Sequence, residues 1–162
     1  MPARKKPTAS QAASQAPTSA PETRRKRQVR SGISSPEVKG RVLIVEDDVP
    51  LSAVVEDTLT YEGYAVVGTA RSAEEAISMA VDRGPDLVLM DVRLLGNSDG
   101  IAAAGEILER TGIRCLMATG QTDAKTKARA ALVQPLGWLP KPYGNEEMVQ
   151  AVADALLCNR AS

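Results

Sequence analysis

Several side chains that could hold a metal ion or act on a phosphate group each follow a short apolar run. They comprise carboxylates, one hydroxyl and one ammonium group, and they are Glu46, Asp47, Asp91, Thr119 and Lys141. Carboxylates packed together raise one another's pKa, so such a cluster needs a cation. Mg²⁺ suits these oxygen ligands. The whole set would support phosphoryl transfer, which depends mainly on positioning and charge neutralisation.

The segments between these side chains alternate short apolar runs with amphipathic stretches. Continuous apolar runs predict strands that are buried on both faces, and apolar positions three and four residues apart predict helices. The predicted strands, each followed by a helix, cover 42–45, 64–67, 86–90, 115–118 and 138–140. The alternation predicts an α/β fold, namely a (βα)₅ domain with a five-stranded parallel sheet covered by helices on both faces, and right-handed crossovers leave only a few topologies for it.

The predicted fold brings the chemically interesting side chains to one edge of the sheet. Ligands of doubly wound sheets bind outside the carboxyl ends of the strands, and each of these side chains stands at such an end. We therefore expect them to share one pocket. Asp91 ends a wholly apolar strand, and it is hard to explain as structural because burying an unpaired carboxylate is costly.

The apolar stripes also assign the helix faces that should pack on the sheet. Ser72 with Glu75 predicts a capping box, and Asn145 predicts the N-cap of the last helix. A fourth helix, over 122–132, is predicted to be only weakly apolar. The residues predicted to face the core are Leu51, Val54, Val55, Thr58 and Leu59, then Ala73, Ala76, Ile77 and Ala80, then Ile101, Ala104, Gly105 and Leu108, and finally Met148, Val149, Val152 and Leu156.

The composition excludes several functional classes. Histidine is absent from the 162 residues, so no mechanism can use a histidine base, nucleophile or metal ligand. Cys115 and Cys158 fit neither a zinc spacing nor a CxxC motif, and a reducing, cytoplasmic location is expected. No apolar run reaches the length of a membrane span. A dinucleotide-binding glycine pattern and a P-loop are both missing.

The first part of the chain differs from the rest in charge. Residues 1–40 carry nine basic and two acidic residues, whereas residues 41–162 carry eleven basic and eighteen acidic ones. With few large apolar side chains, residues 1–38 are predicted to form a disordered basic tail, ahead of a folded domain over 39–160. The run Arg24–Arg27 could bind nucleic acid weakly, although a solvated tail is the simpler interpretation.

Five segments, in order, resemble the receiver domain of two-component response regulators. They are VLIVEDD (42–48), PDLVLMDVRL (85–94), DGIAAAGEI (99–107), LMATG (116–120) and LPKPY (139–143). The resemblance covers about residues 40–160, which is the whole predicted domain. It implies a flavodoxin-like, doubly wound (βα)₅ fold whose five-stranded parallel sheet has the strand order 2-1-3-4-5. Because the last predicted helix ends near Ser162, we expect a stand-alone, single-domain receiver.

The resemblance implies a role for each residue of the predicted pocket. Asp91 would be the phosphoacceptor. Lys141 would pair with Asp91 and then with the phosphoryl group, which Thr119 would also bind. The implied Mg²⁺ ligands are the carboxylates of Asp47 and Asp91, Glu46 acting through water, and the backbone carbonyl of Arg93.

Neighbouring positions also match the family or depart from it. Thr119 and Trp138 would form a switch pair whose side chains move on phosphorylation. The Lys141–Pro142 bond resembles one that is often cis in the family. Asp48 is interpreted as a carboxylate at a helix N-terminus. The loop after Asp91 lacks the proline of many receivers, and a long Arg93 side chain there could shield the phosphoryl group or orient water.

The implied function is a phosphorylation-dependent signalling switch. A histidine kinase or histidine phosphotransfer protein would donate the phosphoryl group. The chain would not be an enzyme beyond its own phosphorylation and dephosphorylation. Its output would be contact with an unknown protein at the face formed by the fourth helix, the fifth strand and the fifth helix. No membrane partner is expected.

Two other functions remain open at this point. One is a Mg²⁺-dependent phosphohydrolase with an aspartyl nucleophile. That family has a second aspartate two residues after the nucleophile, where this chain has Arg93. The other is a pseudo-receiver that binds partners without being phosphorylated, and the complete set of acidic, hydroxyl and ammonium residues argues against it.

Overall fold

The structure, a computed structural model, describes residues 37–97, 99–120 and 123–161, without the side chain of Asn97. The predicted basic tail lies outside these residues apart from its last two positions, and it stays a prediction. The elements are β1 (Arg41–Val45), α1 (Val49–Tyr61), β2 (Ala65–Ala70), α2 (Ala73–Arg83), β3 (Leu87–Asp91), the 3₁₀ turn η1 (Leu95–Asn97), α3 (Gly100–Thr111), β4 (Cys115–Thr119), α4 (Ala124–Ala131), β5 (Gly137–Pro140) and α5 (Asn145–Arg160).

The strands form one five-stranded sheet in the order β2-β1-β3-β4-β5, and every neighbouring pair is parallel. This confirms the predicted fold class and strand order. The order reverses between β1 and β3, because the chain moves from β1 outward to β2 and then returns to the other side of β1. Crevices for ligands form at such reversal points in α/β sheets.

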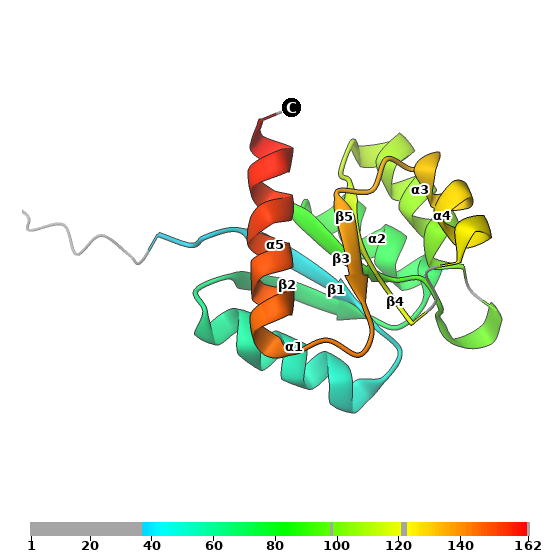
Figure 1. Cartoon of the computed structure of the whole chain (residues 1–162). Helices are drawn as coiled ribbons and strands as arrows, with labels where there is room; N and C mark the ends of the chain where they lie inside the picture. The colour runs from blue at the N-terminus through cyan, green and yellow to red at the C-terminus, as the bar shows by residue number, and fades with distance from the viewer. Residues whose placement is uncertain (1–36, 98, 121–122, 162) are drawn as a thin grey trace, which may run out of the picture. The chain divides into compact units, whose positions relative to one another are not determined.

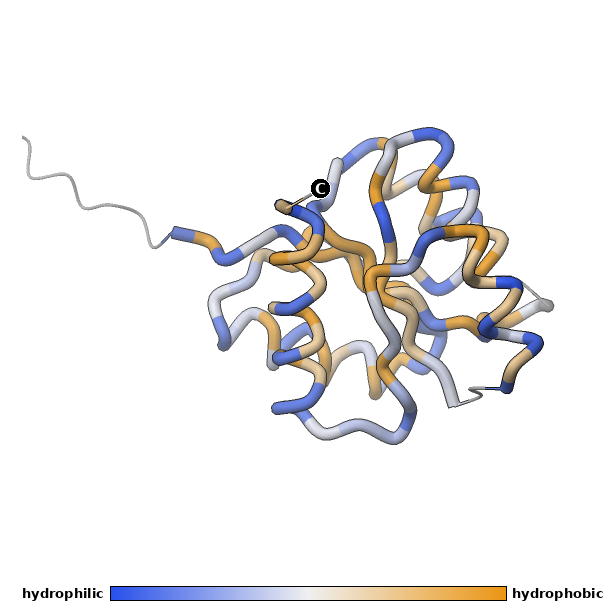
Figure 2. Tube along the Cα trace, turned by 45° about the horizontal axis from the view of Figure 1, so that its top comes forward, coloured by the Kyte–Doolittle hydropathy of each residue, from blue (hydrophilic) through white to orange (hydrophobic). Residues whose placement is uncertain are grey.

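Helices cover both faces of the sheet, as the long apolar strand runs predicted. One core cluster joins the strands to α2, α3 and α4, and the other joins them to α1 and α5. Figure 1 shows α1 and α5 on the near side of the sheet. In Figure 2 the apolar residues of the central strands lie between the two helical layers. Within the described residues, no helix has both the length and the apolar character needed to cross a membrane.

Three predicted helix faces need correction. In α1, Val54 is 51% exposed, whereas Ser52 is buried and its hydroxyl donates to the Val49 carbonyl. In α3 the core receives Ala103 and Ile107 rather than Gly105 and Leu108. In α5, Ala155 is buried, whereas Val149 is only partly buried. The buried face depends on how each helix is rotated when it docks, and apolar spacing leaves that rotation open by about one residue.

The predicted helix starts are partly right. Ser72 caps α2 by accepting from the Glu75 N–H, but the Glu75 carboxylate accepts from the Arg71 N–H instead of completing the box. The N-cap of α5 is Gly144 and not Asn145, because the backbone is still extended at Gly144 and already helical one residue later. The Glu147 carboxylate accepts the Gly144 N–H at 3.0 Å.

Strand β2 is longer and more exposed than predicted. It continues to Ala70, and its residues before Ala70 are only partly buried because β2 lies at the sheet edge. Its pairing with β1 skips one residue between Val66 and Gly68, which is a β-bulge. The Arg83 side chain donates to the carbonyl of the bulged Val67. A Cβ at Gly68 would collide with that guanidinium group.

Candidate functional site

The five predicted pocket residues lie at the carboxyl edge of the central strands. Glu46 directly follows β1, Asp91 ends β3, and Thr119 ends β4. In the sheet register Asp91 pairs with Ala118, and Thr119 pairs with Pro140, the residue before Lys141. The parallel register therefore brings chain segments that are far apart in sequence to one edge.

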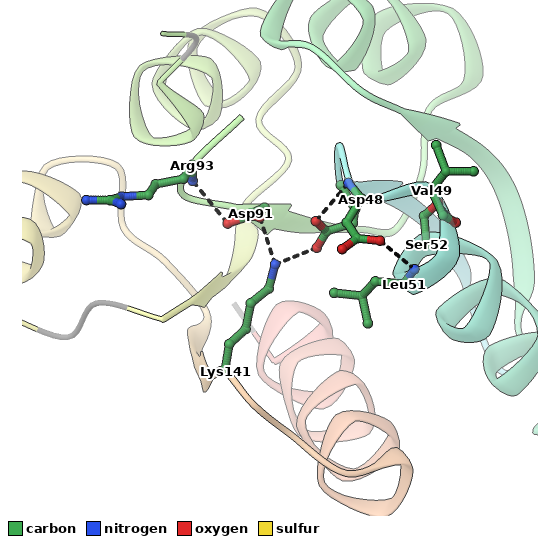
Figure 3. Close-up of polar contacts among 8 residues, drawn as sticks. Asp48, Val49, Leu51, Ser52, Asp91, Arg93 and Lys141 are labelled. Atoms are coloured by element: carbon green, nitrogen blue, oxygen red, sulfur yellow. Dashed lines mark hydrogen bonds and ion pairs between the residues drawn. The ribbon is translucent and has the colours of Figure 1, made fainter. Parts of the chain in front are cut away.

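Lys141 joins the ends of β1 and β3. Its Nζ lies 2.6 Å from Glu46 Oε2 and 2.7 Å from Asp91 Oδ2. Figure 3 shows the Lys141 side chain, which follows the carboxyl end of β5, reaching toward Asp91. Glu46 and Asp91 are 5% and 7% exposed, so this ammonium group neutralises charge that water cannot screen well. The peptide bond from Lys141 to Pro142 is cis, as expected.

Three carboxylates lie close enough to hold one metal ion. Glu46, Asp47 and Asp91 each offer an oxygen atom, and these atoms all lie within 4.8 Å of one another. Asp47 is partly buried, between the protein interior and solvent. Within the described part of the chain, these three carboxylates outnumber the ammonium group of Lys141 that pairs with two of them, which leaves an excess of negative charge. Hard oxygen ligands with open positions fit Mg²⁺, which usually keeps several waters.

Burial and pairing shift the pKa values of two groups in this cluster. The pKa of Glu46 is raised, because burial and the neighbouring Asp91 charge outweigh the hydrogen bond from Lys141. Burial alone would lower the pKa of Lys141, but its hydrogen bonds to Asp91 and Glu46 outweigh burial and raise it. Lys141 therefore remains a cation at neutral pH.

Asp48 has the structural role that was predicted. Its Oδ1 accepts the Leu51 N–H at 3.0 Å, which caps α1. The sequence did not reveal a second role, in which the Asp48 backbone N–H donates to Glu46 Oε1 at 3.3 Å. Figure 3 shows Asp48 at the start of α1, next to the cluster. The first turn of α1 thus helps to orient a carboxylate of the site.

The backbone after Asp91 orients the other oxygen of this carboxylate. The Arg93 N–H donates to Asp91 Oδ1 at 3.0 Å. The Arg93 side chain is exposed and extends away from Lys141 in Figure 3, so it does not shield Asp91 in this arrangement. The role of the Arg93 carbonyl as a metal ligand stays a prediction.

Thr119 and Trp138 lie on the strands beside β3. Thr119 is 1% exposed, and its carbonyl accepts the Lys141 N–H at 2.8 Å, which ties β4 to the Lys141 segment. Trp138 is partly buried and packs against the core cluster that α2, α3 and α4 share. Their movement as a switch pair stays a prediction.

Sequence reasoning missed the importance of Gly100. Its N–H donates to the Val92 carbonyl at 3.1 Å. A Cβ on Gly100 would lie well inside van der Waals contact of the Asp91 carbonyl oxygen. Glycine therefore lets the N-terminus of α3 pack directly on the backbone of the proposed phosphoacceptor. The Asp99-Gly100 pair was the available signal, because a close backbone approach is one reason for a glycine.

Comparison with known proteins agrees with this geometry. A family model described as the response regulator receiver domain matches residues 42–153. The transcriptional regulatory protein PdtaR of Mycobacterium tuberculosis is 37% identical over 117 residues, which cover 71% of this chain and 56% of that protein. The transcriptional regulatory protein YrkP of Bacillus subtilis is 30% identical over 108 residues, covering 67% and 46%. The chain spans about half the length of these curated relatives.

Solved structures show the same likeness. The signal receiver domain of a modulated diguanylate cyclase from Desulfovibrio desulfuricans has 31% identity and a TM-score of 0.69, covering 75% of this chain and 97% of that chain. A two-component response regulator of the LuxR family from Aurantimonas has 29% identity and a TM-score of 0.68, covering 74% and 86%. With the family model matching most of the folded part, the chain belongs to the response-regulator receiver domain family.

Proposed function

We propose that this chain is a phosphorylation-dependent signalling switch whose phosphoacceptor is Asp91. The observation that carries the proposal is the Lys141 ammonium group, which bridges Glu46 and Asp91 beside a third carboxylate, Asp47. This arrangement holds one carboxylate ready to react while its neighbours can bind a divalent cation. The donor would be a histidine kinase or a histidine phosphotransfer protein, because the chain itself has no histidine.

The residues of the site divide the work of the transfer. A carboxylate oxygen of Asp91 attacks the phosphorus of the phosphohistidine, an O–P bond forms, the N–P bond breaks, and the electron pair returns to the donor imidazole. Lys141 then shifts from the Asp91 carboxylate to an oxygen of the new phosphoryl group, and the Thr119 hydroxyl donates to another. Glu46, Asp47, Asp91 and the Arg93 carbonyl would hold Mg²⁺, which neutralises charge on the transferring group.

The same pocket would reset the switch. Water attacks the phosphorus of the acyl phosphate, the bond to the Asp91 oxygen breaks, and inorganic phosphate leaves. Arg93 projects away from Lys141 in the unphosphorylated arrangement (Figure 3), so its guanidinium group does not lie over the Asp91 carboxylate. Phosphorylation of Asp91 from a phosphodonor and hydrolysis of the resulting acyl phosphate are the only reactions that we propose for the chain.

The output is proposed to be a change in protein contacts. Trp138 and Pro140 line a hollow of about 640 Å³ along β5 and α5, together with acidic residues of α5 such as Glu147. Rearrangement of Thr119 and Trp138 would alter this surface and the adjoining α4. The output partner at this α4–β5–α5 face is unknown.

Intact-mass measurement after incubation with acetyl phosphate tests the proposal directly. We expect a gain of one phosphoryl group with Mg²⁺ and no gain with a chelator. Asp91→Asn should abolish the gain, whereas the control Asp57→Asn, an exposed position on α1, should leave it unchanged. Persistent labelling of Asp91→Asn at the wild-type level would reject the assignment.

The same samples distinguish the two alternatives. Steady release of phosphate from small phosphate esters, in excess of the protein, would indicate a phosphohydrolase. The presence of Arg93, where that family has its second aspartate, argues against this result. Absence of any phosphoryl gain, from acetyl phosphate or from a phosphorylated histidine phosphotransfer protein, would indicate a pseudo-receiver.

A further inference from the structure

Helix α4 is held to the rest of the domain by little apolar packing. Among its eight residues only Ala130 is buried, and it joins the core cluster of α2 and α3. An ion pair reaches beyond the helix, from the Arg129 guanidinium group to the Asp99 carboxylate. Figure 1 shows α4 beside α3, at whose start Asp99 lies. Elements with few buried apolar contacts open most easily, so this ion pair matters to the position of α4.

Asp99 connects Arg129 to the loop beside Asp91. One oxygen of the Asp99 carboxylate accepts the Ile101 N–H at 2.9 Å and caps α3, and the other receives the Arg129 guanidinium group. The backbone of Asp99 forms an isolated antiparallel bridge with Arg93. The Asp99 carboxylate at the start of α3 is therefore linked through its own backbone to the loop that follows β3.

The bridge ends at the residue that orients the proposed phosphoacceptor. The Arg93 N–H donates to Asp91 Oδ1, whereas Lys141 holds Oδ2. The orientation of the Asp91 carboxylate thus depends on two anchors. Lys141 supplies one of them, and the Arg93 backbone, stabilised by Asp99 and Arg129, supplies the other.

We propose that Arg129 is a positioning residue for Asp91, acting through Asp99 and the Arg93 backbone, and that it couples α4 to the reactivity of the phosphoacceptor. The inference rests on the proposed function for the role of Asp91. Coupling between two sites is reciprocal. A change in the loop after Asp91 would therefore alter the position of α4, and a shift of α4 would alter the orientation of the Asp91 carboxylate.

Hydrogen exchange in the unphosphorylated protein tests the coupling without any phosphodonor. Arg129→Ala should speed amide exchange in residues 92–97 by about two- to fivefold, the size expected for loss of one exposed ion pair. Asp99→Asn keeps an N-cap acceptor but removes the charge, and it should speed exchange in α4 by a similar factor. The control is Arg110→Ala, which removes the Arg110–Glu106 pair within α3, where both side chains are about half exposed. It should leave both segments unchanged.

Phosphorylation kinetics then separate positioning from simple support of the fold. With saturating acetyl phosphate and Mg²⁺, Arg129→Ala should slow the gain of phosphoryl by about two- to fivefold, Arg129→Lys should restore part of the rate, and Arg110→Ala should match the wild type. The Asp99→Asn, Arg129→Ala double variant should be no slower than the slower single variant, because both changes break the same link.

Failure of this inference can be told apart from failure of the proposed function. A wild-type chain that never gains a phosphoryl group would reject the function while leaving the exchange experiment valid. If Arg129→Ala behaves like Arg110→Ala in both exchange and rate, while the wild type is phosphorylated, the positioning role of Arg129 is overturned.

Discussion

The two helices on either side of β5 are attached in opposite ways. Over its sixteen residues α5 buries Met148, Val152, Ala155 and Leu156, whereas α4 buries only Ala130. A fully buried large apolar side chain contributes about 1.5–3 kcal/mol, and one methyl group far less. Lys141 lies just before the firmly packed helix. The difference indicates that the firmly packed α5 fixes the position of the Lys141 ammonium group. In contrast, α4 can shift with little loss of buried apolar surface.

The largest expected effect comes from testing this difference in packing directly. Met148→Ala should lower the free energy of unfolding by about 2–5 kcal/mol, because it leaves a cavity against the sheet. The corresponding change in α4, Ala130→Gly, should cost about 1 kcal/mol, mostly helix propensity. Urea unfolding at equilibrium measures both. Equal losses for the two variants would break the comparison.

A somewhat smaller effect should follow from adding one methyl group beside Asp91. Gly100→Ala should destabilise the protein by about 1–3 kcal/mol, because the new Cβ forces the start of α3 away from the end of β3. The control is Gly120→Ala, where a Cβ would meet nothing within 4 Å. Both variants can be compared by urea unfolding. An unchanged stability for Gly100→Ala would show that α3, like α4, shifts easily.

Removing one charge from the acidic cluster should raise stability. Asp47→Asn relieves repulsion with the neighbouring carboxylates of Glu46 and Asp91, which pair with Lys141, and we expect a gain of about 0.5–1 kcal/mol without metal. Mg²⁺ binding, measured by titration calorimetry, should weaken at the same time. Asp57→Asn on the outer surface of α1 should change neither property. A loss of stability in Asp47→Asn would contradict the view that the cluster is strained for function.

The reactivity of the two cysteines compares the buried sheet with the outer surface of α5, and it needs no substitution that would alter stability. Burial raises the pKa of the Cys115 thiol in β4 to about 12, and the Cys158 thiol lies on the exposed side of α5. Since the thiolate is the reactive form, iodoacetamide at pH 8 should label Cys158 in the folded protein and Cys115 only after unfolding. Mass spectrometry of the labelled chain gives the answer. Early labelling of Cys115 would mean that the sheet opens far more readily than its packing indicates.

Much of the fold was predictable because parallel strands buried on both faces leave a clear pattern. The runs at 42–45 and 115–118 matched β1 and β4 within one residue. The same reasoning located Glu46, Asp91 and Lys141 at strand ends, where a parallel sheet must bring them to one edge. The N-cap role of Asp48 followed from local spacing alone.

Other features depended on contacts between distant segments. The burial of Ser52 in place of Val54 reflects the rotation of α1 as it docks, which its own sequence does not determine. The packing of Gly100 on Asp91 and the pairing of Arg129 with Asp99 link residues whose separation carries no periodic signal. No local pattern predicted the ion pair, and the glycine of the Asp99-Gly100 pair was only a general signal of a close backbone approach.

By itself the sequence determined the order of the strands and helices and the chemical groups at the strand ends, because both follow from local apolar periodicity. Only the tertiary structure decided which of these groups touch. Lys141 reaches Glu46 across 95 residues and Asp91 across 50. Such pairs form only when the sheet register has placed β1, β3 and β5 side chains within a few ångströms of one another.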